Sequence, residues 1–178
     1  MAAASTTAVS SLISIEQYLN TDYRPDVDYV DGYIEERNLG EFDHGDLQLE
    51  IGTLLRIRQK EWAIRVVTET RMRVSPTRVR IPDVCVIEAG RKREPVILHP
   101  PLLCIEVLSP RDSLKAMRKR SQDYLDMGVP QIWIFDPSTR TAHICTSSRM
   151  TGHTDGILKL PGTQVELSVT EVFATLDA

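Results

Sequence analysis

Two apolar segments of the chain each contain a single acidic residue. Asp83 lies in 81-IPDVCVI-87, and Glu106 lies in 102-LLCIEVLS-109. Both segments have the composition of buried strands, and a buried ionised carboxylate costs several kcal/mol unless a partner compensates it. Acids on two neighbouring strands could bind one Mg²⁺ ion, which takes oxygen ligands from one or two carboxylates and from substrate phosphates. The alternative is that each acid pairs with one of the arginines in residues 65–80.

A predicted helix over residues 113–128 follows Glu106 and carries basic side chains. At 100° per residue, one face should pack on the sheet. This face contains Leu114, Met117, Ser121, Tyr124 and Leu125. Arg118 and Arg120 border the face, where a long side chain can reach a cleft, whereas Lys119 points to solvent. Arg120 precedes Tyr124 by one helical turn, so the two could act together. The same spacing also fits a solvated helix edge.

The charge of the protein is unevenly distributed along its 178 residues. The net charge is −4, but residues 56–80 hold eight Lys/Arg against two Glu, and residues 111–120 hold five against one Asp. Such segments can form a basic face on an acidic protein. The alternative is ordinary solvated surface.

Composition excludes several classes of protein. With 42% hydrophobic residues and no apolar run of about 20, the sequence predicts a globular protein without a membrane span. The three cysteines are widely spaced within apolar segments, which favours reduced thiols and a cytoplasmic location over a disulfide framework. Residues 1–13 are small and hydroxylated and predict a disordered tail, followed by one domain over residues 14–178.

The elements that must position the acids alternate between helices and strands, so the sequence predicts an α/β fold, a mixed central sheet flanked by helices. Helices are expected over 14–20, 43–62, 113–128 and 168–176. Strands are expected over 62–74, 79–89 and 102–109, with a hairpin over 26–37 around Asp31-Gly32 and a strand pair over 131–147.

Several motifs, in order, resemble one known family. They are RPDVDYVDGYIEE, DHGDLQ, RIPDVCVI, PPLLCIEVLSP and DYLDMGVPQIWIFDP. Between residues 14 and 147 the chain resembles the Uma family of putative restriction endonucleases, part of the PD-(D/E)XK nuclease superfamily. The resemblance implies a restriction-endonuclease-like fold. It also implies that Asp83, Glu106 and the carbonyl of Val107 bind Mg²⁺ or Mn²⁺.

The resemblance also suggests which basic group serves the site. The superfamily lysine two residues after the second acid would fall at Leu108. In the resembled family this lysine occupies the following helix, four residues before the tyrosine Tyr124, and that position is Arg120. Lys119 is adjacent. Arginine can stabilise a phosphorane-like transition state but does not release a proton near neutral pH.

His44 and Gln48 match the first-helix pattern of the family and are candidates for the same cleft; the alternative for His44 is a helix-surface position without a catalytic part. The leading hypothesis is a Mg²⁺-dependent DNA endonuclease, with a homodimer expected from restriction-like relatives. The alternative is a catalytically inactive nuclease-fold protein that binds nucleic acid or another protein.

Overall fold

The computed structural model describes residues 12–38 and 40–177. Residues 1–11 of the predicted N-terminal tail lie outside these ranges. Ile13 donates its N–H to the Gly32 carbonyl (3.0 Å), and its own carbonyl accepts a hydrogen bond from the Tyr29 hydroxyl (2.9 Å). The folded domain therefore includes Ile13, one residue before the predicted boundary.

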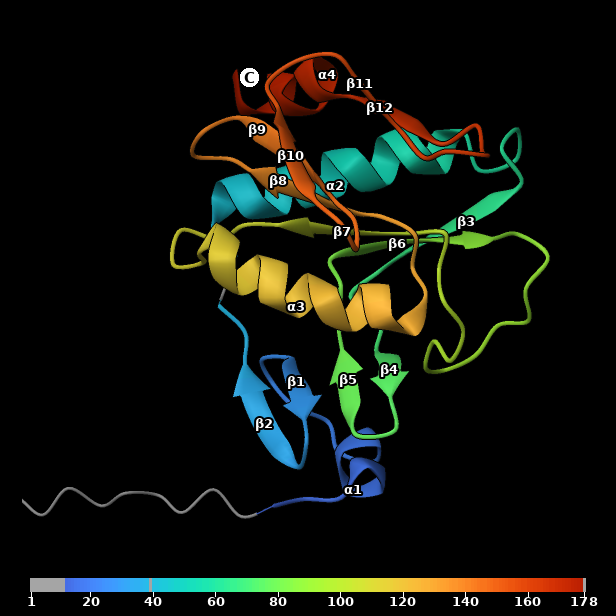
Figure 1. Cartoon of the computed structure of the whole chain (residues 1–178), viewed down its shortest axis with the longest axis vertical. Helices are drawn as coiled ribbons and strands as arrows, with labels where there is room; N and C mark the ends of the chain where they lie inside the picture. The colour runs from blue at the N-terminus through green and yellow to red at the C-terminus, as the bar shows by residue number, and fades with distance from the viewer. Residues whose placement is uncertain (1–11, 39, 178) are drawn as a thin grey trace, which may run out of the picture.

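A six-stranded mixed sheet forms the centre of the molecule (Figure 1), in the order β10-β9-β8-β7-β6-β3. Its strands are β3 (Ile64–Thr68), β6 (Val84–Glu88), β7 (Leu103–Val107), β8 (Ile132–Asp136), β9 (Thr141–Cys145) and β10 (Met150–His153). Strands β7 and β8 are parallel, and the other neighbours are antiparallel. The predicted α/β class with a mixed sheet is confirmed.

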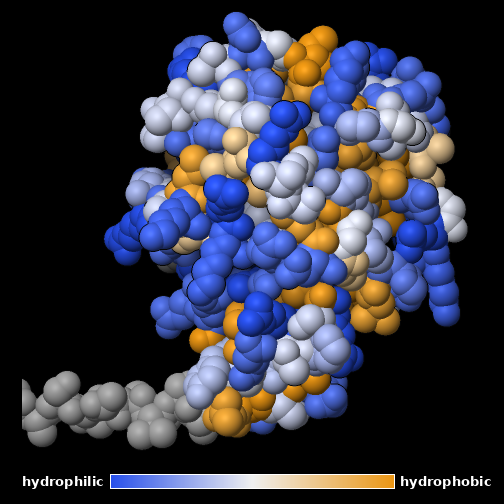
Figure 2. Space-filling model, viewed as in Figure 1, coloured by the Kyte–Doolittle hydropathy of each residue, from blue (hydrophilic) through white to orange (hydrophobic). Residues whose placement is uncertain are grey.

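Helices cover both faces of this sheet. Helix α2 (Phe42–Ile57) and the short α4 (Val169–Ala174) lie on one face, and α3 (Leu114–Met127) lies on the other (Figure 1). Leu47, Ile51 and Leu55 of α2 pack on the first face, while Met117 and Tyr124 of α3 pack on the second. Hydrophilic residues cover most of the surface seen in Figure 2, including a band across the middle of the molecule.

A second sheet of four antiparallel strands projects from the α3 side, in the order β2-β1-β5-β4. Its strands are β1 (Val27–Val30), β2 (Tyr33–Glu36), β4 (Met72–Ser75) and β5 (Arg78–Arg80), and α1 (Ile15–Leu19) packs beside it. The predicted hairpin turn is confirmed, because Asp31 and Gly32 have φ of 51° and 96°, as a two-residue turn requires.

Two of the predicted strands are wrong as single elements. Residues 62–74 divide into β3 and β4, and residues 79–89 divide into β5 and β6, with each half in a different sheet. The chain changes direction at Glu69, whose φ of 47° is left-handed. Apolar alternation continues through both breaks because the halves bury against different cores, so periodicity alone does not reveal them.

Other boundaries differ less. Helix α2 ends at Ile57 and not at residue 62, and residues 58–62 form turns. The predicted terminal helix is confirmed as α4, with Ser168 as its cap, followed by a 3₁₀ turn over Thr175–Asp177. Strands β10, β11 (Ile157–Lys159) and β12 (Glu166–Ser168) were not predicted from the sequence. Within residues 12–38 and 40–177, no helix is both long and apolar enough to cross a membrane.

Candidate active site

Asp83 lies one residue before β6, and Glu106 lies in the neighbouring strand β7. Val84 of β6 pairs with Ile105 of β7, so the next position along this antiparallel ladder places Asp83 across from Glu106. The Val107 N–H also donates to Asp83 Oδ2 at 2.7 Å. Alternation along β7 directs Glu106 to the α3 side of the sheet. Both carboxylates are buried, with side-chain exposures of 2% and 1%.

Side chains of helix α2 and of the β2–α2 connection surround Asp83. Arg37 places Nη2 2.8 Å from Asp83 Oδ1 and Nη1 2.6 Å from Glu69 Oε2. His44 Nε2 lies 3.9 Å from Asp83 Oδ1. Gln48 donates to the Asp83 carbonyl at 3.1 Å and to Glu69 Oε1 at 3.0 Å. The structure thus brings His44 and Gln48, both expected from the sequence, beside the first acid.

Glu106 is contacted by helix α3. The Tyr124 hydroxyl donates to Glu106 Oε1 at 2.5 Å, and Arg120 Nε lies 3.6 Å from the same oxygen. Arg120 Nη2 instead bonds Asp28, 3.0 Å from Oδ2. Arg120 Nε is buried and has no hydrogen-bond partner within the described part of the chain. Lys119 is exposed. The helical wheel therefore placed these two residues correctly, with Arg120 beside the acid and Lys119 facing outward.

The environment disfavours the charged form of both acids. Burial raises the pKa of Asp83 to about 6, although Arg37 and the Val107 N–H act in the other direction. Burial raises the pKa of Glu106 to about 7, opposed by Arg120 and reinforced by the charge of Asp83. Burial also lowers the pKa of His44, so this imidazole is neutral at pH 7. The arginines therefore compensate the two carboxylates only in part.

Neither acid opens onto a cleft in the structure described. A layer of other side chains separates them from solvent. His44 lines a cavity of about 360 Å³, Arg37 and Arg120 line another of about 540 Å³, and Gln48 lines a third of about 670 Å³. Arg37 covers Asp83 through its ion pair, whereas Tyr124 and Arg120 of α3 cover Glu106. Any ligand that contacts either carboxylate must therefore displace part of this layer.

The two acids suit a hard divalent cation, although they do not form a complete ligand set. Among the described residues, no group of three or more His, Cys, Asp or Glu side chains could hold a metal ion. Mg²⁺ needs only one or two carboxylates when water and phosphate oxygens complete its shell. A cation between Asp83 and Glu106 would also reverse the raised pKa of each. The pair therefore fits such an ion, and the Val107 carbonyl as a third ligand stays a prediction.

Three residues of this arrangement were missed in the sequence. Arg37 and Glu69 contact the Asp83 side of the site, and Asp28 holds Arg120. The sequence does contain one indication that Arg37 has a special role, because it is the sole Lys or Arg between residues 25 and 55. Glu69 carries no comparable signal, since its position depends on the sheet change that periodicity does not show.

The fold and the paired acids together define a class, the restriction-endonuclease-like nuclease fold. The family model described as "Putative restriction endonuclease", Uma2, matches residues 15–175. The chain belongs to the Uma2 family. This finding confirms the family suggested by the sequence motifs and supports a nuclease function.

A solved structure agrees on the fold. A putative nuclease of the DUF820 group from Anabaena variabilis superimposes with a TM-score of 0.81 at 21% identity, covering 92% of this chain and 99% of that one. A DrdV–DNA complex matches with a TM-score of 0.39 at 15% identity, over 71% of this chain and 10% of that one. None of the curated proteins compared with the chain matches it.

Proposed function

We propose that the protein is a metal-dependent endonuclease that hydrolyses phosphodiester bonds in DNA, with Asp83 and Glu106 holding Mg²⁺ or Mn²⁺. One observation carries the proposal. An acid that immediately precedes β6 and an acid of the neighbouring strand β7 are both buried and keep raised pKa values despite nearby arginines, and the charge of Asp83 contributes to the raised pKa of Glu106. A cation bound here would stabilise the charged form of both carboxylates. Acids with perturbed pKa values are typical of functional sites.

When bound, the metal ion would polarise the scissile phosphate and lower the pKa of the attacking water. The residues around it have separate tasks. Tyr124 fixes the orientation of Glu106 through its hydroxyl, and Arg120 provides a permanent positive charge for the developing phosphorane. Because its guanidinium stays protonated, Arg120 does not act as the base. His44 is neutral and close to Asp83, so it is the side chain available to accept a proton.

Arg37 is a second phosphate ligand in this proposal. In the absence of substrate it neutralises Asp83 and Glu69 together. A metal ion on Asp83 would release one of these interactions, and the guanidinium could then bind a DNA phosphate with its fork of donors. The homodimer and the cytoplasmic location stay predictions.

A second candidate, an inactive nuclease-fold protein that binds nucleic acid or a partner, is favoured by one specific observation. The superfamily lysine position holds Leu108, a buried residue in the core beneath α3. In addition, each acid already contacts an arginine. Such a protein would keep the carboxylates without the chemistry.

Cleavage of supercoiled plasmid in Mg²⁺ or Mn²⁺ separates the two candidates. Wild type should cut, Asp83→Asn should not, and both should give the same circular dichroism spectrum. Arg120→Lys adds a second arm. A slower Arg120→Lys variant would show that the guanidinium is the adapted group. If the Arg120→Lys variant cleaves and wild type does not, wild type lacks only the lysine expected at position 120. No cleavage by either protein would favour the binding module.

A further inference from the structure

A groove lies between helix α2 and strand β3, beside the candidate active site. Its cavity of about 670 Å³ is lined by Gln48, Thr53, Arg56, Thr68 and Thr70, among others. Because β3 is the terminal strand of the six-stranded sheet, no neighbouring strand covers this edge among the described residues. Gln48 connects the groove to the site through its bonds to the Asp83 carbonyl and to Glu69.

The groove has an open floor made partly of helix backbone. A Cβ atom added at Gly45 would meet nothing within 4 Å, and one added at Gly52 would meet only Thr68 Cγ2 at 4.0 Å. The walls carry the hydroxyl groups of Thr53, Thr68 and Thr70. Apolar side chains, Leu49, Val66 and Val67, also line the groove. The open space above Gly45 and Gly52, bordered by threonine hydroxyl groups, leaves room for a sugar–phosphate backbone.

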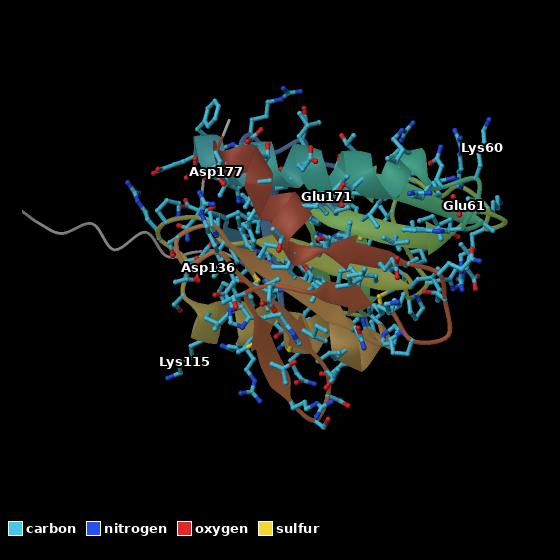
Figure 3. The ribbon with its side chains drawn as sticks, turned by 90° about the horizontal axis from the view of Figure 1, so that it is seen from above. Lys60, Glu61, Lys115, Asp136, Glu171 and Asp177 are labelled. Carbon is cyan, nitrogen blue, oxygen red and sulfur yellow. The ribbon has the colours of Figure 1, made fainter. Side chains whose placement is uncertain are left out.

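A basic cavity of about 460 Å³ continues the groove at its far end. The two cavities share Arg56, Val66, Val67 and Thr70 in their walls. Figure 3 shows the two ends of α2: Lys60 lies beyond one end, and Asp177 lies near the other. The basic cavity belongs to the Lys60 end, since Gln59 also lines it.

The positive charge of this cavity is unusual within the protein. Arg56, Arg65, Lys92 and Arg93 line it, and none has a carboxylate within 4.0 Å among the described residues. The arginines around Asp28, Asp83 and Asp123 are all paired with acids. Arg65 is held in place by the carbonyls of Ala89 and Arg91, at 3.1 and 3.3 Å. The acid in the same wall, Glu94, lies 4.0 Å from His99.

We propose that the α2–β3 groove and its basic cavity bind the phosphate backbone of DNA that enters or leaves the active site. The inference rests on the proposed nuclease function, which it extends with a path for the substrate. Gln48 and Arg56 are separated by eight helical residues, roughly 12 Å. A DNA strand advances about 3.4 Å per nucleotide along a duplex axis, so Arg56 would contact a phosphate three or four nucleotides from the one beside Gln48.

The test measures binding without cleavage. A fluorescent DNA duplex is titrated in EDTA with the Asp83→Asn protein, and the anisotropy is followed at several salt concentrations. A triple variant replaces Arg56, Lys92 and Arg93 by Gln in the same background, leaving Arg65 to hold its loop. Three lost phosphate contacts should lower the slope of log K against log salt by about 2.7.

A matched triple variant controls for total charge. It replaces the exposed residues Lys115, Arg118 and Arg149 by Gln, so both triples have the same net charge. Figure 3 shows Lys115 on the opposite side of the sheet from Lys60. Equal losses in both triples, no DNA binding at low salt, or tighter binding of an RNA of the same length would overturn the proposal. A wild type that binds through the groove but never cleaves would refute only the nuclease function.

Discussion

The molecule buries acids in two neighbouring clusters that share Arg120 but differ in their partners. In the first cluster, Asp28 accepts hydrogen bonds from Arg80 (2.9 Å), Arg120 (3.2 Å) and the Ile81 N–H (3.2 Å). Asp123 accepts from Arg80 and from Arg78, both at 2.7 Å. In the second cluster, Asp83 precedes β6 and Glu106 lies in the adjacent strand β7, and Arg120 approaches Glu106 only to 3.6 Å.

The comparison separates burial from function. Asp28, Asp83 and Glu106 are each 1% exposed, so burial alone does not distinguish them. The first cluster gives each acid full hydrogen bonding to guanidinium groups, as a structural network does. The second leaves two carboxylates side by side with raised pKa values. We infer that Asp28 holds Arg120 by its Nη2 and thereby keeps Nε, which lacks a partner in the described part of the chain, close to Glu106.

The largest effect should come from breaking the structural cluster. Arg80→Met removes the guanidinium that joins Asp28 to Asp123 and leaves buried acids short of partners. We expect a loss of about 3–5 kcal/mol in the free energy of unfolding, measured with urea. Arg140→Met, which breaks the exposed pair with Asp177, is the control and should change stability little. Similar losses of unfolding free energy in both variants would show that the buried Arg80 network contributes no more than an exposed ion pair.

Neutral isosteres should have opposite effects in the two clusters. Because the pKa of Glu106 is raised in the folded state, metal-free wild type loses stability as the pH rises from about 4.5 to about 7. Glu106→Gln does not carry this cost. It should be more stable than wild type by on the order of 1–3 kcal/mol at pH 8, with the gain absent below pH 4.5.

Asp28→Asn is the counterpart and should destabilise the protein at pH 8, because Arg80 and Arg120 lose their shared carboxylate. Urea unfolding across this pH range measures both variants. A destabilised Glu106→Gln protein at pH 8 would mean that its carboxylate is compensated as fully as that of Asp28.

A smaller effect is expected at Arg37, which competes with a metal ion for Asp83. Arg37→Gln should tighten Mn²⁺ binding about tenfold, a change of about 1.4 kcal/mol, as measured by isothermal titration calorimetry. Arg140→Gln removes a distant surface cation and should leave the affinity unchanged. Weaker Mn²⁺ binding by Arg37→Gln would instead make Arg37 a support of the metal site.

Sequence reasoning found the burial of Asp83 and Glu106 and the helix beside them, for a physical reason. An acid within an apolar strand is costly, so Asp83 and Glu106 stand out in any pattern of burial. The helical wheel then distinguished Arg120 from Lys119. The sheet change at Glu69 and the pairing of Arg37 with Asp83 could not be found this way. Arg37 reaches Glu69 and Asp83 across 32 and 46 positions of the sequence, and the sheet change depends on which strands pair. Local periodicity encodes neither.

Metal-linked stability tests the central claim most directly, namely that Asp83 and Glu106 form a cation site and Asp28 does not. Urea unfolding at pH 8 is compared with and without Mn²⁺ for wild type, Asp83→Asn and Asp28→Asn. At a concentration 100 times its dissociation constant, Mn²⁺ should stabilise wild type by about 2.7 kcal/mol. Asp28→Asn should keep this gain, and Asp83→Asn should lose it. No gain in wild type, or an equal gain in Asp83→Asn, would contradict the account.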